Sequence, residues 1–292
     1  MEGRPIDGIV LVDKPAGITS HDVVSTARRA FGTRRIGHGG TLDPFATGLL
    51  VLLIGHATRL VPHLDGEPKV YDATVAFGSE TDTDDVTGTV VRSASPPDAQ
   101  RVRDAVVSLT GTFDQMPPSY SAKQVGGRRA YDAARRGAPL ELAPVRVTVH
   151  EWVVHNLTAE RLDATITCGG GTYIRALARD LGRRCESAAH LAALRRTRSG
   201  SFGIGDAVSL DAVRAGDATP RPAIDALPHL PAVALSAADV AHVRHGRAIP
   251  AADGLAENAA STAALTDSEG RLVGVAERVS NTWQPRVVLP DA

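Results

Sequence analysis

A glycine-rich run near the N-terminus presents one carboxylate, Asp43, in a setting that suits covalent chemistry. The run Gly37–Gly48 reads GHGGTLDPFATG. Three glycines among its first four residues allow the backbone to approach a ligand closely, and Pro44 restricts the backbone directly after Asp43. A carboxylate that is held on such a rigid loop is suited to act as a nucleophile.

Other interpretations of this run compete with the nucleophile. A phosphate-binding loop is disfavoured because the run has neither a GK[ST] ending nor GxGxxG spacing. A structural turn, in which Asp43 only caps a backbone amide, stays open. Metal hydrolysis with His38 and Asp43 lacks further ligands at matching spacing. A retaining glycosidase needs a second carboxylate about 5 Å from the first, and the acidic cluster 82–85 could supply one.

The distribution of charge, more than its total, bears on a nucleic-acid partner. The 292 residues carry a net charge of −1, which by itself argues against phosphate binding. Residues 1–205 hold 25 basic and 22 acidic side chains, whereas residues 206–292 hold 7 and 11. Two stretches are basic: Lys123–Arg146, with six basic residues against two acidic, and Arg175–Arg198, with seven against two. Such patches suit a polyanion, although two solvated helix faces would give the same pattern.

Composition argues against several protein classes. With 43% hydrophobic and 22% charged residues, the chain has an ordinary globular composition. No apolar run reaches the roughly 18 residues of a membrane span, and the N-terminus lacks a signal-peptide pattern. Cys168 and Cys185 have no CxxC or Cys/His spacing, which indicates core thiols rather than a zinc site or a disulfide. We therefore expect a cytoplasmic protein without a metal.

The elements that position these residues are expected to form an α+β fold. Alternating apolar residues predict strand pairs, and hairpins separated by helices favour a mixed, largely antiparallel sheet over a doubly wound parallel one. Ser20 can cap the first helix, and Thr172 the later helix that contains Arg175. The expected elements are strands at 8–12, 69–77 paired with 88–92, and 146–156 paired with 161–168, and helices at 21–31, 98–111 and 173–181.

A shift in composition divides the chain into three parts. Residues 1–205 form the expected catalytic domain, and residues 206–229 form a connector rich in Ala, Pro and Asp. Residues 230–292 contain short strand-like pieces and predict a small, mostly β domain.

Four motifs, in this order along the chain, resemble the bacterial tRNA pseudouridine-55 synthases of the TruB family. The resemblance covers roughly residues 5–205, and the last domain is loosely similar to the small PUA-like RNA-binding domain of many members. It implies the pseudouridine synthase fold, in which helices and loops flank a mixed, largely antiparallel sheet. The motifs are KPAG and SHDVV within 14–24, GHGGTLDPFATG at 37–48, KVY at 69–71, and GTYIR at 171–175.

The resemblance also implies roles for individual residues. Asp43 matches the family's nucleophile, and Arg175 matches the arginine that pairs with it and favours its ionised form. Tyr71 matches the ring that stacks on the flipped uracil, and it is a candidate for the base that removes a proton. Five further residues are expected to bind substrate: His38 beside the target nucleotide, Tyr173 and Leu194 as walls of the base pocket, Asp85 in the acidic segment, and Lys14 in the first motif.

The implied reaction is isomerisation of one uridine in the T-loop of tRNA, at nucleotide 55, after the base is flipped out of the RNA. The N1–C1′ bond breaks and a C5–C1′ bond forms, so nothing is oxidised and no cofactor is needed. Attack of Asp43 at C6 of the base and its involvement at C1′ both stay open. The expected partner is the T-arm, lying across both basic stretches, and the protein is expected to act as a monomer.

Two other hypotheses fit the same residues. The chain could be an RNA-binding or RNA-folding module whose catalysis is secondary, in which case its effect would survive Asp43→Asn. It could also be a guide-RNA-dependent synthase that needs protein partners, which activity of the isolated protein on bare tRNA would exclude.

Overall fold

The computed structural model describes residues 7–120, 124–125, 128–129, 140–251 and 261–290, and these divide into two compact units. Unit 1 contains the chain up to Asp43, Leu49–Gly66 and the chain from Ser201 onward. Unit 2 contains Pro44–Gly48 and Glu67–Gly200. The strand β3 (Thr47–Ile54) contributes its first two residues to unit 2 and the remainder to unit 1.

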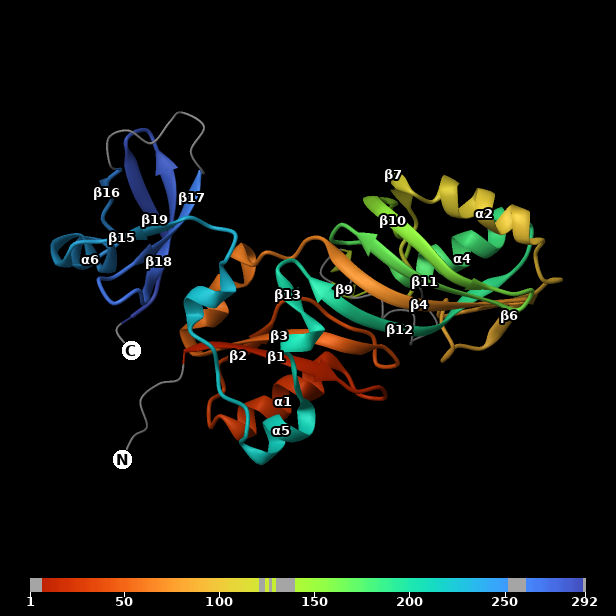
Figure 1. Cartoon of the computed structure of the whole chain (residues 1–292), viewed down its shortest axis with the longest axis horizontal. Coiled ribbons are helices and arrows are strands. Elements are labelled where there is room, and N and C mark those ends of the chain that lie inside the picture. The colour runs from red at the N-terminus through yellow and green to blue at the C-terminus, as the bar shows by residue number, and fades with distance from the viewer. Residues whose placement is uncertain (1–6, 121–123, 126–127, 130–139, 252–260, 291–292) are drawn as a thin grey trace. The chain divides into compact units, whose positions relative to one another are not determined.

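Two apolar strands form the centre of unit 1 (Figure 1). β1 (Gly8–Lys14) lies between β3 and the short β14 (Val208–Ser209), and β2 (Ile36–His38) pairs antiparallel with β3. Both central strands are buried almost throughout, because alternate side chains enter two different cores. One core includes the helices α1 (Ser20–Ala30) and α5 (Leu210–Ala215). The other includes η1 (Gly55–His63), β13 (Phe202–Gly203) and η3 (Ala223–Ala226).

The end of the chain forms a β-rich region with its own core. Its five strands lie in the order β15-β17-β18-β19-β16, and α6 packs beside them. The segment before it, which the sequence marks as a connector, is folded: β14 pairs in parallel with β1, and Ile9 forms a bridge with Arg221. The elements of the last region are β15 (Ala232–Ala234), α6 (Ala237–Arg244), β16 (Ile249–Pro250), β17 (Thr262–Thr266), β18 (Leu272–Val279) and β19 (Thr282–Val288).

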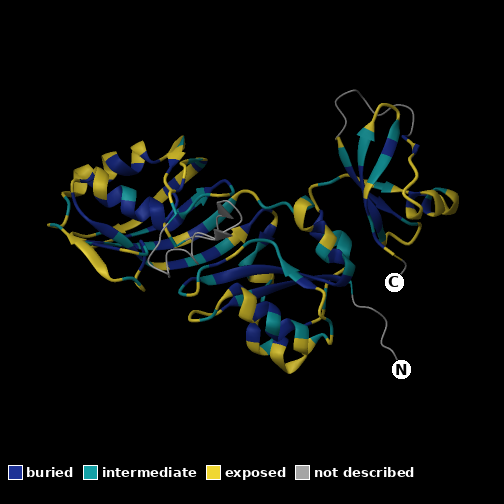
Figure 2. Cartoon of the chain, turned by 180° about the vertical axis from the view of Figure 1, so that it is seen from behind, coloured by how far each residue is buried: buried dark blue, intermediate teal, exposed yellow. Residues whose placement is uncertain are grey.

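Unit 2 is an antiparallel sheet with helices. Its main strands lie in the order β12-β4-β11-β10-β7, and the first residues of β3 run parallel to β12. Figure 2 shows that the helices turn buried residues toward the strands and exposed residues outward. The predicted pairing of 146–156 with 161–168 is confirmed by β10 and β11. The main elements are β4 (Lys69–Phe77), α2 (Ala99–Ser108), β7 (Gly111–Gln115), β10 (Val145–Leu157), β11 (Arg161–Cys168), α4 (Ile174–Arg184) and β12 (Ala189–Ser199).

The predicted pairing of 69–77 with 88–92 is wrong. β4 pairs with β11 and β12 along its whole length, so neither of its edges is open to a further strand. β6 (Val90–Ser93) pairs instead with β5 (Ser79–Thr81). Gly78, with φ of +95°, turns the chain directly after β4, and β5 therefore leaves the sheet and takes β6 with it.

Both predicted helix caps also differ from the structure. Thr19 is the N-cap of α1, where it exchanges hydrogen bonds with Asp22 in a capping box. Tyr173 is the N-cap of α4, because the hydroxyl of Thr172 donates to the carbonyl oxygen of Gly169 (2.9 Å) and closes the preceding turn. Ser20 is therefore available for another contact.

The predicted fold class is confirmed. Helices and a mixed, largely antiparallel set of strands form an α+β structure with a β-rich C-terminal region. In the described part of the chain, no helix is long and apolar enough to cross a membrane.

Candidate functional site

The predicted site residues are distributed over both units. Unit 1 holds the nucleophile candidate Asp43 together with Lys14 and His38. Unit 2 holds Tyr71, Asp85, Tyr173, Arg175 and Leu194. The pairing of Asp43 with Arg175, which would join residues of different units, therefore stays a prediction.

The loop that carries Asp43 is anchored at the residue directly before it. The hydroxyl of Ser20 donates to the carbonyl oxygen of Leu42 (3.1 Å) and accepts from the N–H of Leu42 (2.9 Å). Ser20 is only 3% exposed, so water does not compete for these bonds. The half-buried Asp43 thus follows a fixed peptide, as a pre-organised nucleophile requires.

Further hydrogen bonds shape the start of the same loop. The N–H of Gly39 donates to the carbonyl oxygen of Val51 (2.9 Å), and the N–H of Gly40 donates to Nδ1 of His38 (3.4 Å). A neutral His38 that accepts at Nδ1 carries its proton on Nε2.

Lys14 is buried and bonds to the backbone of the turn that follows it. It has no exposed surface, and its ammonium group donates to the carbonyl oxygens of Pro15 (2.9 Å) and Ile18 (2.8 Å). Burial lowers the pKa of Lys14 to about 8, while the charges of Asp43 and Asp22 oppose this shift. The charge of Lys14 therefore acts on Asp43, and the predicted contact of Lys14 with substrate stays a prediction.

Gly48, where the glycine-rich run ends, is the glycine with the strictest packing requirement in that run. Its φ is +103°, and a Cβ there would lie 2.3 Å from the carbonyl oxygen of Arg196. A Cβ on Gly37, by contrast, would meet nothing nearer than 3.8 Å. The close approach at Gly48 is between two strands, since Thr47 and Gly48 pair with β12.

Tyr71 and Leu194 lie on neighbouring strands of unit 2. Tyr71 is 7% exposed on β4, in register with Ile166 on one side and Arg196 on the other. Leu194, on β12, lines a hollow of ≈ 350 Å³. The polar side chains of that hollow are Thr47, Asp72, Thr74, His155, Asp163 and Arg195.

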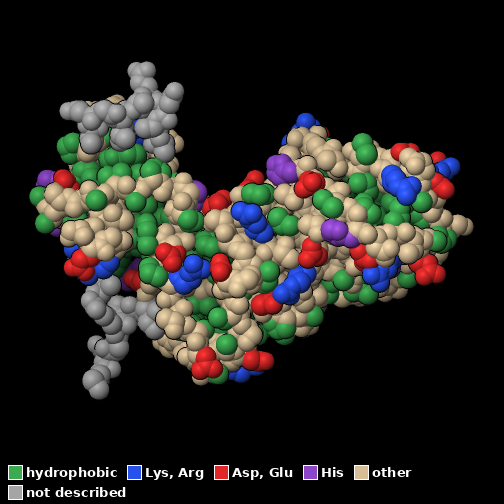
Figure 3. All heavy atoms as spheres, viewed as in Figure 1, with side chains coloured by type: hydrophobic (Ala, Val, Ile, Leu, Met, Phe, Trp, Pro, Cys, Tyr) green, Lys and Arg blue, Asp and Glu red, His purple; other side chains and the backbone are tan. Residues whose placement is uncertain are grey.

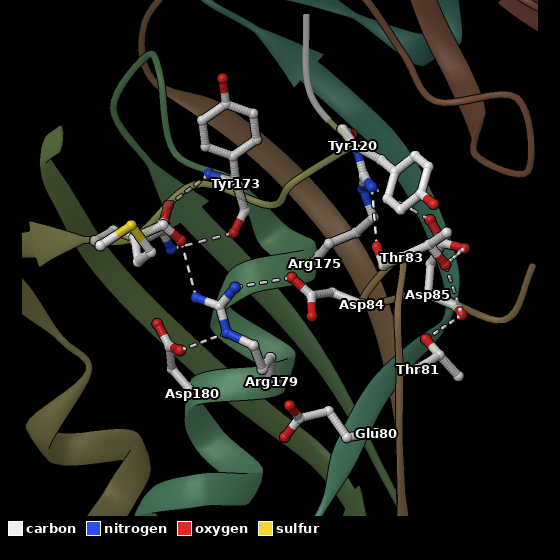
Figure 4. Close-up of polar contacts among 12 residues, drawn as sticks. Glu80, Thr81, Thr83, Asp84, Asp85, Tyr120, Tyr173, Arg175, Arg179 and Asp180 are labelled. Atoms are coloured by element: carbon white, nitrogen blue, oxygen red, sulfur yellow. Dashed lines mark hydrogen bonds and ion pairs between the residues drawn. The ribbon is translucent and has the colours of Figure 1, made fainter. Parts of the chain in front are cut away.

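The arginines of α4 face an acidic segment of the same unit (Figure 4). Arg175, Arg179 and Arg183 are spaced by four residues, which places them on one side of the helix. Arg175 lies 3.5 Å from Asp85, Arg179 lies 2.8 Å from Asp84, and Arg183 pairs with Glu80. Each arginine therefore meets a carboxylate from residues 80–85.

Asp85 is held from several sides. Its Oδ1 accepts from the hydroxyl of Thr83 (2.8 Å) and from the N–H and hydroxyl of Thr87 (2.9 and 2.5 Å). Its Oδ2 faces Arg175, which also donates to the carbonyl oxygens of Thr83 (2.9 Å) and Tyr120 (2.8 Å). Asp85 is 4% exposed and faces Arg175, and its predicted contact with substrate stays a prediction.

These ion pairs show that several arginines of the basic stretch Arg175–Arg198 are engaged within the protein, while the T-arm contact expected across 183–198 stays a prediction. Three of the seven arginines in 175–198 pair with residues 80–85, and Arg196 is 2% exposed. On the face seen in Figure 3, Lys and Arg side chains are scattered among Asp and Glu rather than gathered in one patch. Much of the other basic stretch, 123–146, lies outside the described residues.

Three functional candidates were missed at the level of sequence: Ser20, Gln115 and Arg179. Ser20 was assigned to a helix cap, and nothing local connects it with Leu42. Arg179 follows Arg175 by four residues on a predicted helix, and this spacing was a usable signal. Gln115 is 1% exposed and bonds to Tyr173, 58 residues away, which no local pattern indicates. Among the residues that the structure describes, no group of three or more His, Cys, Asp or Glu could hold a metal ion.

Comparison with protein families gives three matches that follow one another along the chain. Residues 28–174 match the "TruB family pseudouridylate synthase (N terminal domain)". Residues 175–224 match the "tRNA pseudouridylate synthase B C-terminal domain", and residues 231–289 match "Pseudouridine synthase II TruB, C-terminal".

Individual relatives and solved structures agree with these matches. A tRNA pseudouridine synthase B from Thermobifida fusca is 43% identical, with 97% of this chain and 98% of that protein covered. One from Gloeobacter violaceus is 44% identical, with 98% and 99% covered. A solved structure titled "Structure of H/ACA RNP bound to a substrate RNA containing 2'-deoxyuridine" has a similar fold, with a TM-score of 0.70 at 21% identity over 97% of this chain and 85% of that one.

Proposed function

Because the chain belongs to the TruB family of pseudouridylate synthases, we propose that it isomerises uridine to pseudouridine in transfer RNA. The carrying observation in the structure is the anchored carboxylate: Asp43 is half-buried and follows the Leu42 peptide, which Ser20 fixes by two hydrogen bonds. A fixed carboxylate fits covalent catalysis on a base or sugar. The full-length similarity to enzymes named tRNA pseudouridine synthase B supports tRNA as the RNA.

We assign the target to the uridine at nucleotide 55 of the T-loop. A base in a folded T-loop is not reachable by a carboxylate on a protein loop, so the nucleotide is flipped out before reaction. Tyr71 provides a ring for stacking, and Tyr173 and Leu194 form walls of the base pocket. This assignment rests on the four sequence motifs, which name the position through their resemblance to the pseudouridine-55 synthases.

In the proposed reaction, Asp43 attacks the uridine at C6 or takes part at C1′, and the N1–C1′ bond breaks. The base turns, C5 bonds to C1′, and the bond to Asp43 breaks again. The hydrogen on C5 leaves as a proton, for which Tyr71 is the candidate acceptor, and N1 gains a proton in its place. The reaction conserves all atoms apart from this exchange with water, and it uses no cofactor. The charge of the buried Lys14 acts on Asp43 and favours its ionised form. Arg175 is assigned the same effect because it matches the arginine that pairs with the nucleophile in the family.

We also assign a role to each of three parts of the chain. Residues 1–205 are the catalytic domain, 206–229 connect it, and 230–292 are a small PUA-like domain. The enzyme acts as a monomer in the cytoplasm and needs neither a guide RNA nor a protein partner. The phosphate backbone of the T-arm contacts basic side chains other than those that form ion pairs within the protein.

The test is tritium release from a tRNA transcript that carries 5-tritiated uridine, since formation of the C5–C1′ bond expels the label. The pure protein alone should release one equivalent, and a transcript with cytidine at nucleotide 55 should release none. Asp43→Asn should abolish release while tRNA binding persists, and Asp104→Asn, an exposed residue on α2, is the matched control. Full activity of Asp43→Asn would refute the assignment of the nucleophile. A requirement for added RNA or protein would refute independent action.

A further inference from the structure

Gln115 is a buried side chain that bonds to the backbone of one residue at the start of α4. It ends β7, is 1% exposed, and its Oε1 accepts from the N–H of Tyr173 (2.9 Å). Its Nε2 donates to the carbonyl oxygen of the same residue (3.1 Å). One carboxamide thus bonds to both the backbone N–H and the backbone carbonyl of Tyr173, and this requires a donor and an acceptor on the same side chain.

The start of α4 depends on such an external partner. Tyr173 is the N-cap, and within the described structure its own side chain makes no capping hydrogen bond. Its carbonyl oxygen accepts the first helical bond from the N–H of Leu177 (3.0 Å), but its N–H has no acceptor within the helix. Gln115 provides that acceptor from a neighbouring strand, as a Glu or Gln at the third helical position does in a capping box.

The chain that follows Gln115 is bonded to the same helix. Arg179 donates through Nη2 to the carbonyl oxygen of Met116 (2.8 Å), and Arg175 donates through Nη2 to that of Tyr120 (2.8 Å). Arg175 and Arg179 therefore each bridge this segment and the acidic residues 83–85 (Figure 4). Because Arg175 and Arg179 follow Tyr173 on α4, a shift of the Tyr173 peptide would displace both arginines and the hydrogen bonds that they make.

We propose that Gln115 is a positioning residue for the reaction: its carboxamide fixes the Tyr173 peptide and, through it, the Tyr173 ring and Arg175. The inference rests on the proposed function, in which Tyr173 lines the base pocket and Arg175 acts on the nucleophile. Gln115 acts through these residues and touches no reacting atom. Because tRNA binding is spread over many contacts, the loss of this positioning slows the chemical step more than it weakens binding.

Three variants test this role under single-turnover conditions. Gln115→Met keeps the length and loses both hydrogen bonds, and the chemical step should slow by about 10- to 100-fold, because small misplacements in a reacting geometry have effects of this size. The Kd for tRNA should change by less than about threefold, since phosphate contacts elsewhere dominate affinity. Gln100→Met on α2, an exposed glutamine, is the matched control and should behave as wild type.

Gln115→Glu separates positioning from general packing through its pH profile. An ionised glutamate only accepts, and it repels the Tyr173 carbonyl, so the rate at pH 8 should resemble that of Gln115→Met. A protonated glutamic acid has one donor and one acceptor, like the carboxamide. Its rate relative to wild type should therefore rise as the pH falls toward 5.5, whereas the relative rate of Gln115→Met should stay constant.

A second measurement does not depend on catalysis. Hydrogen–deuterium exchange of the peptide 169–178 should be faster in Gln115→Met than in wild type, with exchange of β18, a strand of unit 1, unchanged. A wild-type rate for Gln115→Met, equal pH profiles of the Met and Glu variants, or unchanged exchange at 169–178 would each overturn the inference. A wild-type protein that releases no tritium would refute the proposed function instead, and the exchange result would still decide whether Gln115 holds Tyr173.

Discussion

Mutation of the buried ion pair Arg179–Asp84 tests how much this pair contributes to the free energy of unfolding. The two side chains are each 8% exposed, and Nη1 of Arg179 lies 2.8 Å from Oδ2 of Asp84. Replacing Arg179 by Met keeps the volume of the stem but leaves a buried carboxylate without this partner. Removal of one member of a buried ion pair costs about 3–5 kcal/mol, so the free energy of unfolding of Arg179→Met should fall by that amount at pH 8.

The pH dependence of this loss has a definite sign. Burial raises the pKa of Asp84 from 3.8 to about 6, while Arg179 and Arg175 oppose the shift. The folded chain therefore binds this proton more tightly than the unfolded chain, and the stability that Asp84 contributes is complete below pH 3.8 and lost as the pH rises through about 6. Without Arg179 the pKa rises further. The deficit of the variant should thus be smallest near pH 5 and should grow between pH 6 and 8.

The assay is urea unfolding followed by the fluorescence of Trp152, which lies on β10 of the same unit, in a Trp283→Phe background. Asp84→Asn is the companion variant, because Asp84 has φ of +61° and Asn tolerates this conformation. The double variant Arg179→Met/Asp84→Asn should be more stable at pH 8 than Arg179→Met alone, with little pH dependence. A deficit below about 1 kcal/mol, the level of an exposed pair, or an equal deficit at pH 5 and pH 8 would refute the reasoning.

Two further predictions concern the loop that carries Asp43. Gly48→Ala should destabilise the protein by about 2 kcal/mol or more, because its φ of +103° is strained for alanine and the new Cβ meets the backbone of Arg196; thermal unfolding should show Gly37→Ala near wild type. Lys14→Met should cost about 1–3 kcal/mol, since the part-buried hydrogen bonds to two backbone carbonyl oxygens are lost. Because burial lowers the pKa of Lys14 from 10.5 to about 8, wild-type stability includes a rise across that pH range, and the variant should lack it.

Local patterns predicted the strands whose two faces differ. The alternation of Leu162, Ala164, Ile166 and Cys168 with polar residues gave the half-buried strand β11, and its pairing with β10 followed from adjacency along the chain. The failed pairing of β6 had the same local support. It failed because β4 is occupied on both edges by β11 and β12, and residues 88–93 carry no signal of strands that lie 70 or more residues further along the chain.

The charge pattern predicted the partners of the basic side chains less well than the apolar pattern predicted the strands. An arginine stretch has the same sequence whether its side chains face RNA or a carboxylate of the protein itself, and the helical spacing of Arg175, Arg179 and Arg183 fits both. The acidic residues 80–85 were visible in the sequence as a cluster, but their position beside α4 depends on the turn at Gly78.

The start of α4 and the loop that carries Asp43 are both held by hydrogen bonds from a buried side chain to the backbone. The directionality of these bonds explains why polar groups are buried there. An apolar core would stabilise α4 and the Asp43 loop at least as well as buried ion pairs, because desolvation consumes most of the attraction between buried charges. Apolar contacts, however, do not define direction, whereas the carboxamide of Gln115 accepts from one N–H and donates to one carbonyl, and Ser20 does the same for Leu42. The bonds of Gln115 hold the backbone of a proposed site residue, Tyr173, and those of Ser20 hold the residue before another, Asp43. A reaction that relies on the position of one carboxylate and a few rings gains more from fixed direction than from added stability, and this favours the retention of buried polar groups beside Asp43 and Tyr173.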